Sequence, residues 1–345
     1  MRTLPQKTTL TLAGVRGAPA WRISFRAVTF AAVLAMALIV APALARGAEG
    51  AEGKPAPQSV RVAAISFVPE KLDLAGNADR LERAFREAAA GGAKIAVAPE
   101  GVLEGYVVNE MLAGKIPVAR MRDAAIPIDH HLIRRFQDLA KSLGLCLVFG
   151  FAERISADVF NTAVFIDDAG VIRGKYHKMQ LAEGYHPDWW WNRLGVQSRA
   201  FDTPYGRCGI LICNDRWNPA LARIPALDGA QFLVIPSYGS KSEAQDAAVL
   251  ARGRENGLPV VEANVGVSLI VSGGEIAALR REAVAVTFSE IVRPTAAVRD
   301  PAARDAEEQK FLEWRSGEMR RRFEAKVYPG LETLKPGAAA QAPAR

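Results

Sequence analysis

The chain has 345 residues, of which 50% are hydrophobic, so it can bury a large core as one large α/β domain or as two smaller ones. Its formal net charge is +7, but residues 1–45 carry five basic side chains and no acidic one, so the remainder has a net charge of only +2. The basic balance therefore gives little support for a nucleic-acid-binding protein.

Residues 1–45 have the three parts of a secretory signal peptide. A basic stretch precedes an apolar run at 27–40, and the small-residue motif Ala43-Leu44-Ala45 follows. We expect cleavage after Ala45 or Ala48 and a flexible leader at 46–58. The mature protein is then expected to be periplasmic or secreted, with no attachment to the membrane once the signal is removed. An uncleaved membrane anchor is the alternative, although the run is short and rich in alanine for a bilayer span.

Helices alternate with β-branched strands from Ser59 onward, which indicates a layered α/β fold. The periodicity predicts strand 60–65, helix 77–90, strand 94–98, helix 130–143, strand 146–151, hairpin strands 160–166 and 170–175, strand 209–212, helix 219–227, strand 232–236, helix 244–256, strand 260–264 and a final β-ribbon of 268–271 with 283–286.

Two stretches follow this alternating region. Residues 300–330 have the pattern of a charge-laced amphipathic helical extension, and 331–345 have the composition of a disordered tail.

The buried strand 209–212 turns polar at Cys213. A thiol at the end of a rigid strand, before a tight turn that can present backbone N–H groups, suits an attacking sulfur. The alternative is a packing role, because free cysteines usually behave as small hydrophobes, and this is our interpretation of Cys146 and Cys208. Cys208 and Cys213 are an odd number of residues apart, so on one strand they face opposite ways and a disulfide is not expected.

Glu100 and Lys178 also follow predicted strands. Glu100 comes after the apolar run Val97-Ala98-Pro99, where a carboxylate is either a helix cap or a base. Lys178 closes the run Lys175-Tyr176-His177-Lys178. Each of them taken alone is a typical solvated surface charge.

Glu100, Lys178 and Cys213 in this order resemble the marks of the nitrilase superfamily of carbon–nitrogen hydrolases. The stretches that carry the resemblance are Pro99-Glu100, Gly105-Tyr106, Lys175-Tyr176-His177-Lys178, Ile212-Cys213-Asn214-Asp215 with Pro219, Ala251-Arg252-Gly253-Arg254-Glu255-Asn256-Gly257 and Val260-Val261-Glu262-Ala263-Asn264. The resemblance implies a carbon–nitrogen hydrolase domain over 59–299, built as a four-layer αββα sandwich that commonly pairs into a homodimer or a higher homo-oligomer.

The resemblance also implies a role for each of these residues. Glu100 is the expected general base, and Cys213 the nucleophile that attacks an amide carbonyl or a nitrile carbon. Lys178 is expected to stabilise the oxyanion beside a backbone N–H near Asn214, and its charge to lower the pKa of the thiol. This chemistry requires no metal and no organic cofactor.

A second glutamate often accompanies the lysine in this superfamily. Glu183 is our candidate for it, and Glu153 is the fallback. His177 is adjacent to Lys178 on extended chain, so its side chain should point away from that of Lys178 and have a structural role.

Aromatic and polar residues near these motifs are candidates for the substrate pocket, namely Tyr106, Asn214, Trp217 and Tyr238. The run Trp189-Trp190-Trp191 suits a pocket wall equally well as it suits a core edge or a subunit interface.

The pair Asn214-Asp215 after the cysteine resembles the amidase and carbamoylase branches more than the nitrilases, which usually have Trp-Glu there. We therefore expect an exported cysteine-dependent amidohydrolase that cleaves a small linear amide or N-carbamoyl compound through a thioester and releases ammonia. Nitrile hydrolysis at the same site and a non-catalytic exported dimeric scaffold are the alternatives.

Overall fold

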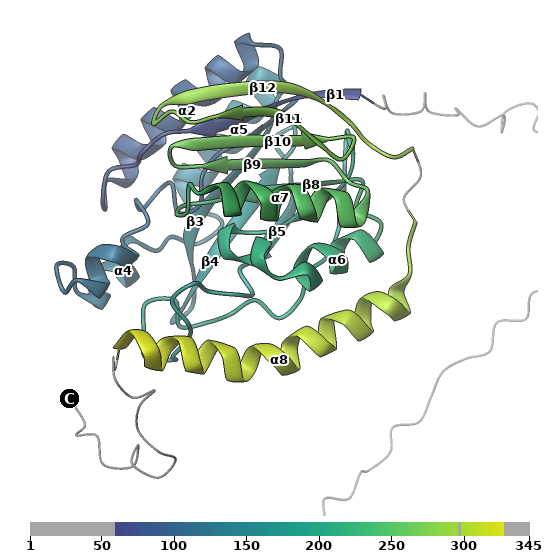
Figure 1. The fold of residues 1–345 in the computed structure, drawn as a ribbon. Coiled ribbons are helices and arrows are strands. Elements are labelled where there is room, and N and C mark those ends of the chain that lie inside the picture. Colours follow the sequence, from purple (N-terminus) through teal and green to yellow (C-terminus); the bar gives the residue numbers. More distant parts are fainter. Residues whose placement is uncertain (1–58, 296–297, 328–345) are drawn as a thin grey trace, which may run out of the picture. The chain divides into compact units, whose positions relative to one another are not determined.

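The computed structural model describes residues 59–295 and 298–327 (Figure 1). The predicted signal peptide and leader, 1–58, and the predicted tail, 331–345, lie outside the described residues.

Seven α-helices and one 3-10 helix are present in the described residues. They are α2 (Leu74–Ala90), α3 (Val108–Leu112), α4 (Val118–Ala124), α5 (His131–Leu143), η1 (Cys213–Trp217, the 3-10 helix), α6 (Pro219–Leu227), α7 (Glu243–Asn256) and α8 (Pro301–Val327).

The strands form two six-stranded sheets. The first sheet has the order β12 (Ala285–Val292), β1 (Ser59–Ser66), β2 (Ile95–Val97), β3 (Cys146–Ile155), β4 (Asp158–Ile166) and β5 (Ile172–His177). The second has the order β11 (Glu275–Arg280), β10 (Val267–Ser272), β9 (Val260–Asn264), β8 (Phe232–Pro236), β7 (Gly206–Ile210) and β6 (Phe201–Thr203). Each sheet has three parallel strands, β1-β2-β3 or β7-β8-β9, extended by antiparallel ones, so both sheets are mixed.

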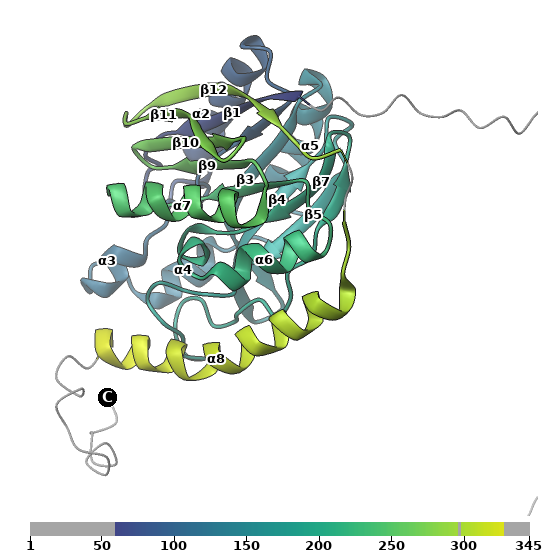
Figure 2. The same cartoon turned by 45° about the vertical axis from the view of Figure 1, so that its right-hand side comes forward.

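The sheets pack face to face, with α2 and α5 on the outer face of the first and α6 and α7 on the outer face of the second (Figures 1 and 2). Successive side chains of a strand point to opposite faces, and β1 shows the result. Val62 and Ala64 belong to the core between the sheets, whereas Ala63 and Ile65 pack in the core under the helices. The expected four-layer αββα sandwich is confirmed.

One predicted pairing is wrong. The stretches 268–271 and 283–286 do not form a ribbon with each other, because β10 pairs with β11 and β12 joins the first sheet antiparallel to β1. Val286 lies opposite Ile65 and packs in the same helix-covered core, so burial of its side chain favours the first sheet. Strand β11 escaped prediction because it is a largely exposed edge strand without alternating apolar residues.

The strand that leads to the cysteine also differs slightly from the prediction. It ends at Ile210 rather than at Ile212, and the turn after it is the 3-10 helix η1. Asn218 caps α6 by accepting a hydrogen bond from the Ala220 N–H, and Pro219 occupies the first turn of that helix. The chain is therefore fixed on both sides of Cys213.

Helix α8 covers most of the predicted extension at 300–330 and runs along the lower side of the sandwich (Figures 1 and 2). It buries Phe311 and Met319, which are 2% and 1% exposed, against the rest of the protein. None of the helices in the described part of the chain has the length and apolarity needed to cross a membrane.

A glycine in β3 sets how closely that strand approaches the segment after β2. A Cβ at Gly150 would lie 2.7 Å from both Glu100 Cα and Gly101 N, whereas a Cβ at Gly317 on α8 would have no neighbour within 4 Å. We expect Gly150→Ala to lower the free energy of unfolding by about 1–3 kcal/mol, as overpacking does. Gly317→Ala should be neutral or slightly stabilising, because alanine is the better helix former. Urea unfolding of the two variants compares them, and equal stabilities would contradict this view of Gly150.

Candidate active site

Cys213 lies on a constrained turn between β7 and α6. Its φ of +46° belongs to the left-handed region, which a side chain other than glycine rarely adopts. The buried carboxylate of Asp215 holds the turn, because it accepts hydrogen bonds from the Ile212 N–H at 2.9 Å, the Gln180 N–H at 3.0 Å and the Tyr176 hydroxyl at 2.9 Å. The sulfur therefore has a fixed position, as a nucleophile requires.

Glu100 and Lys178 form an ion pair that is excluded from solvent. Lys178 Nζ lies 2.7 Å from Glu100 Oε1, and both side chains are 0% exposed. The Asn161 amide donates to the same carboxylate oxygen at 2.6 Å, and the Tyr238 N–H donates to Oε2 at 3.0 Å. Three donors thus hold the carboxylate at both of its oxygens. Both charged residues were candidates from the sequence, but their ion pair and the support from Asn161 on strand β4 were not predicted.

The sulfur of Cys213 has two polar contacts. Arg216 Nη2 donates to Sγ at 3.2 Å, and the thiol donates to the Tyr238 carbonyl oxygen at 3.6 Å. Burial raises the pKa of Cys213, and the nearby Glu100 carboxylate raises it further, although Lys178 and Arg216 act in the opposite direction. The expected effect of Lys178 on the thiol pKa is therefore present, but burial outweighs it. The resting thiol keeps its proton and requires a base.

Lys178 is held as a cation. Burial opposes its charge, but Glu100, and less strongly Cys213 and Glu183, raise its pKa above the ordinary value. An ammonium group close enough to lower the pKa of the Cys213 thiol is a suitable donor for an oxyanion that forms there.

Arg216 belongs to the site but was not predicted from the sequence. Its guanidinium forms a buried ion pair with Glu262 on β9, and Glu262 also accepts from the Ser237 hydroxyl at 2.8 Å and the Gln245 amide at 2.5 Å. A charged pair joined across 46 positions leaves no signal in local periodicity. The only cue in the sequence is an arginine three positions after Cys213.

Glu183, Tyr106 and Tyr238 adjoin the buried ion pair of Lys178 and Glu100. The Tyr106 hydroxyl donates to Glu183 Oε1 at 3.2 Å, while the buried Oε2 has no hydrogen-bond partner. Tyr106 stacks on Tyr238 with ring centroids 4.7 Å apart, and burial raises the pKa of Tyr106. The structure thus brings three of the predicted auxiliary and pocket residues to the ion pair.

The fallback glutamate, Glu153, has other partners. It binds Lys175 at 2.6 Å, His177 Nε2 at 2.8 Å and the Thr162 hydroxyl at 3.0 Å. His177 also stacks on Phe160. These contacts place Glu153 and His177 in a separate polar cluster, which fits the structural role expected for the histidine.

The remaining pocket candidates, Asn214 and Trp217, lie in different environments. Asn214 is buried and its amide donates to the Gln180 carbonyl at 3.2 Å, so its side chain supports the turn. Trp217 is 44% exposed at the end of η1, and the structure does not bring it to the ion pair.

The triple tryptophan belongs mainly to the interior. Trp190 and Trp191 are buried in a core cluster that includes Tyr106, with Trp191 centred 6.5 Å from the Tyr106 ring. Trp189 packs edge-on against Phe323 of α8. This arrangement corresponds to the core-edge interpretation.

Across residues 59–295 and 298–327, no group of three histidine, cysteine, aspartate or glutamate side chains could hold a metal ion. Cys146, Cys208 and Cys213 are all free thiols.

The carbon-nitrogen hydrolase family model matches residues 61–295. The chain belongs to this family, the nitrilase superfamily. It is a hydrolase of carbon–nitrogen bonds other than peptide bonds.

Three similar proteins illustrate its relations. The chain is 31% identical to an N-carbamoylputrescine amidase of Solanum tuberosum over 213 residues, 61% of this chain and 68% of that protein. It is 30% identical to a citrullinase of Francisella tularensis over 217 residues, 59% of this chain and 73% of that protein. A mutant amidase from Nesterenkonia sp. AN1, solved in complex with acrylamide, shares the fold with a TM-score of 0.57 and 21% identity, covering 78% of this chain and 98% of that one.

Arg216 should support the thiolate form of Cys213. Replacing it alone would leave Glu262 buried without its cation, so the double variant Arg216→Gln/Glu262→Gln is the cleaner change. We expect this variant to titrate Cys213 at higher pH than wild type, because one of the two cations that lower the thiol pKa is gone. Thiolate absorbance against pH, with Cys213→Ala subtracted, measures the shift. Arg254→Gln/Glu275→Gln removes an exposed pair as the control, and an unchanged midpoint in the test variant would refute the role.

Glu104 is a buried carboxylate near Glu100 that the sequence analysis missed. Its Oε2 accepts from the Ala152 N–H at 3.0 Å, Oε1 has no partner, and burial raises its pKa from 4.5 to about 7. Between these two values the folded protein keeps a proton that the unfolded chain releases, so this carboxyl lowers stability progressively as pH rises from about 4.5 to 7.

We therefore expect Glu104→Gln to be more stable than wild type at pH 8, by on the order of 3 kcal/mol at most, and to lose this advantage below pH 5. Urea unfolding at both pH values measures the difference. Glu313→Gln, on an exposed position of α8, is the control. An advantage that does not change with pH would show that ionisation of Glu104 is not its cause.

Proposed function

We propose that this protein is an exported, cysteine-dependent amidohydrolase that cleaves small linear amides or N-carbamoyl compounds and releases ammonia. The observation that carries the proposal is the solvent-excluded Lys178–Glu100 ion pair, which is linked through the backbone of Tyr238 to a cysteine on a strained turn. A buried cation and a buried carboxylate are costly to maintain, and strained backbone tends to occur at functional sites.

In the proposed mechanism one proton path serves both half-reactions. Glu100 takes the thiol proton as Cys213 Sγ attacks the amide carbonyl carbon, and the Lys178 ammonium stabilises the resulting oxyanion. The tetrahedral intermediate collapses as Glu100 returns the proton to the amide nitrogen, so that ammonia leaves and a thioester remains. Glu100 then takes a proton from water, which attacks the thioester, and the acid and the free thiol are released when that proton returns to sulfur.

Two observations favour an amide over a nitrile. The buried Glu183 Oε2 has no hydrogen-bond partner, and a carboxylate acceptor suits a carboxamide or ureido N–H, which a nitrile lacks. The relatives named N-carbamoylputrescine amidase and citrullinase point in the same direction. Nitrile hydrolysis stays the alternative reaction of the same residues.

The proposal of export is supported by the signal-like sequence of residues 1–45. A homodimer or higher homo-oligomer is proposed on the resemblance to the superfamily.

Ammonia release from a panel of aliphatic amides, N-carbamoyl amines and nitriles tests the function. We expect turnover of amides or N-carbamoyl compounds, and a loss of at least about a thousand-fold in Cys213→Ala, Glu100→Gln and Lys178→Met, because each removes a separate part of the reaction. Cys208→Ala is the matched control, since that thiol is buried in the core between the sheets.

Preferential turnover of nitriles would favour the alternative reaction. No turnover of any panel member by the wild-type chain, or full activity of Cys213→Ala, would favour the non-catalytic scaffold.

A further inference from the structure

Lys178 and Glu183 lie on a stretch with no helix or strand of its own. From Lys178 to Ala200 the 23 residues are irregular, although many of them are buried. Irregular segments of this length are uncommon inside compact domains and usually serve a function. The catalytic lysine therefore depends on contacts from outside its own segment for a fixed position.

Helix α8 supplies such contacts at the start of this segment. Arg315 donates to the carbonyl of Met179 at 3.3 Å and also to the carbonyl of Gly195. The Gly195 N–H in turn donates to the Lys178 carbonyl at 3.0 Å. The Arg315 guanidinium thus joins Met179, which follows the catalytic lysine, to Gly195, which binds the backbone of that lysine.

A second set of contacts holds the middle of the segment, next to Glu183. The Tyr185 N–H donates to the Met319 carbonyl at 3.0 Å. Gly184 has a φ of +87°, and a Cβ there would lie 2.2 Å from the Phe323 backbone nitrogen. The His186 ring stacks on the Phe323 ring with centroids 4.8 Å apart. The backbone of α8 is therefore in direct contact with the residue that follows Glu183.

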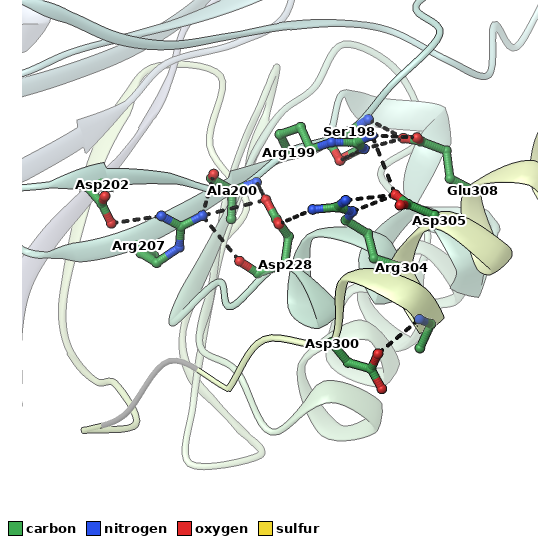
Figure 3. A network of polar contacts seen from close by, with 11 residues as sticks. Ser198, Arg199, Ala200, Asp202, Arg207, Asp228, Asp300, Arg304, Asp305 and Glu308 are labelled. Atoms are coloured by element: carbon green, nitrogen blue, oxygen red, sulfur yellow. Dashed lines mark hydrogen bonds and ion pairs between the residues drawn. The ribbon is translucent and has the colours of Figure 1, made fainter.

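A third set holds the end of the segment (Figure 3). Glu308 accepts from the Ser198 N–H at 2.7 Å and binds the Arg199 guanidinium through both carboxylate oxygens at 2.7 and 2.9 Å. Arg304 binds Asp228 at 2.6 Å, and Asp228 accepts from the Ala200 N–H at 2.9 Å. Charge-assisted and bidentate bonds of this kind add geometric specificity to the attachment.

Helix α8 begins at Pro301, beyond the residues 61–295 that the family model matches. We propose that α8 is a strap that fixes the segment 178–200, and that Arg315 is a positioning residue for the catalytic Lys178. The inference concerns the same site as the proposed function and rests on it only for the effect on turnover.

If α8 only stabilised the fold, its variants would affect the titration of the Cys213 thiol differently than if α8 positions Lys178. Lys178 lowers the pKa of Cys213 by its charge, so displacement of the lysine must move the titration of the thiol to higher pH. Loss of global stability alone leaves the midpoint of that titration where it is.

The test uses the full chain and intact-mass labelling of Cys213 with iodoacetamide across pH. We expect Arg315→Met to raise the midpoint pH of labelling, in the same direction as Lys178→Met. Arg320→Met is the matched control, because Arg320 is an 81% exposed arginine of the same helix that binds only Glu324 among the residues described. It should label as wild type does.

Arg315→Lys separates position from charge and serves if the methionine variant fails to fold. It keeps the cation but loses the planar two-donor group, so a positioning role predicts a midpoint above that of wild type. Full restoration by lysine would show a simple charge effect and overturn the proposal. Hydrogen exchange should also rise within 178–200 in the Arg315 variants and stay unchanged in Arg320→Met; unchanged exchange together with an unchanged midpoint would likewise overturn it.

Turnover gives the last comparison. Loss of oxyanion stabilisation by Lys178 lowers kcat and kcat/KM together, so we expect both to fall about ten-fold or more in Arg315→Met, with KM nearly constant. If the wild-type chain hydrolyses no amide, the proposed function fails, while labelling and exchange still decide whether α8 positions the lysine.

Discussion

The contact between Lys178 and Glu100 is the interaction on which the site depends. Neither charge reaches water, so each loses its hydration and must recover that free energy from the other and from fixed dipoles. Asn161 and the Tyr238 N–H supply those dipoles. Removing either charge would leave the other buried and unpaired, which ties the stability of this region directly to its chemistry.

The ion pair and Cys213 come from different sheets. Glu100 and Lys178 follow β2 and β5 of the first sheet, whereas Cys213 and Tyr238 follow β7 and β8 of the second. The Glu100 N–H donates to the Ser237 carbonyl at 3.3 Å, and this bond directly links the segment after β2 to the segment after β8. The site therefore exists only when the sheets pack face to face, and the apolar core between them, rather than any single loop, sets the distance from the Glu100 carboxylate to the Cys213 sulfur.

Local patterns in the sequence predicted much of this arrangement, because strand and helix periods follow from side chains that are neighbours along the chain. Helix 219–227 and strands 232–236 and 260–264 agree with α6, β8 and β9 at both ends. The pairing of β12 with β1 and the contact of Arg216 with Glu262 were not predictable in this way, since each joins residues far apart in sequence. The exposure of Trp217 was not predictable from local patterns either, because the direction of a side chain after a turn depends on the geometry of that turn.

The protonated resting state of Cys213 has a consequence for its chemical durability. Oxidants react with the thiolate rather than with the thiol, and susceptibility rises with exposure. Cys213 is 7% exposed as a residue, and burial raises the pKa of its thiol, so it presents little thiolate to peroxide. In the proposed mechanism its reactivity is generated only when Glu100 removes the proton, so the same burial that makes a base necessary also protects the sulfur from oxidants.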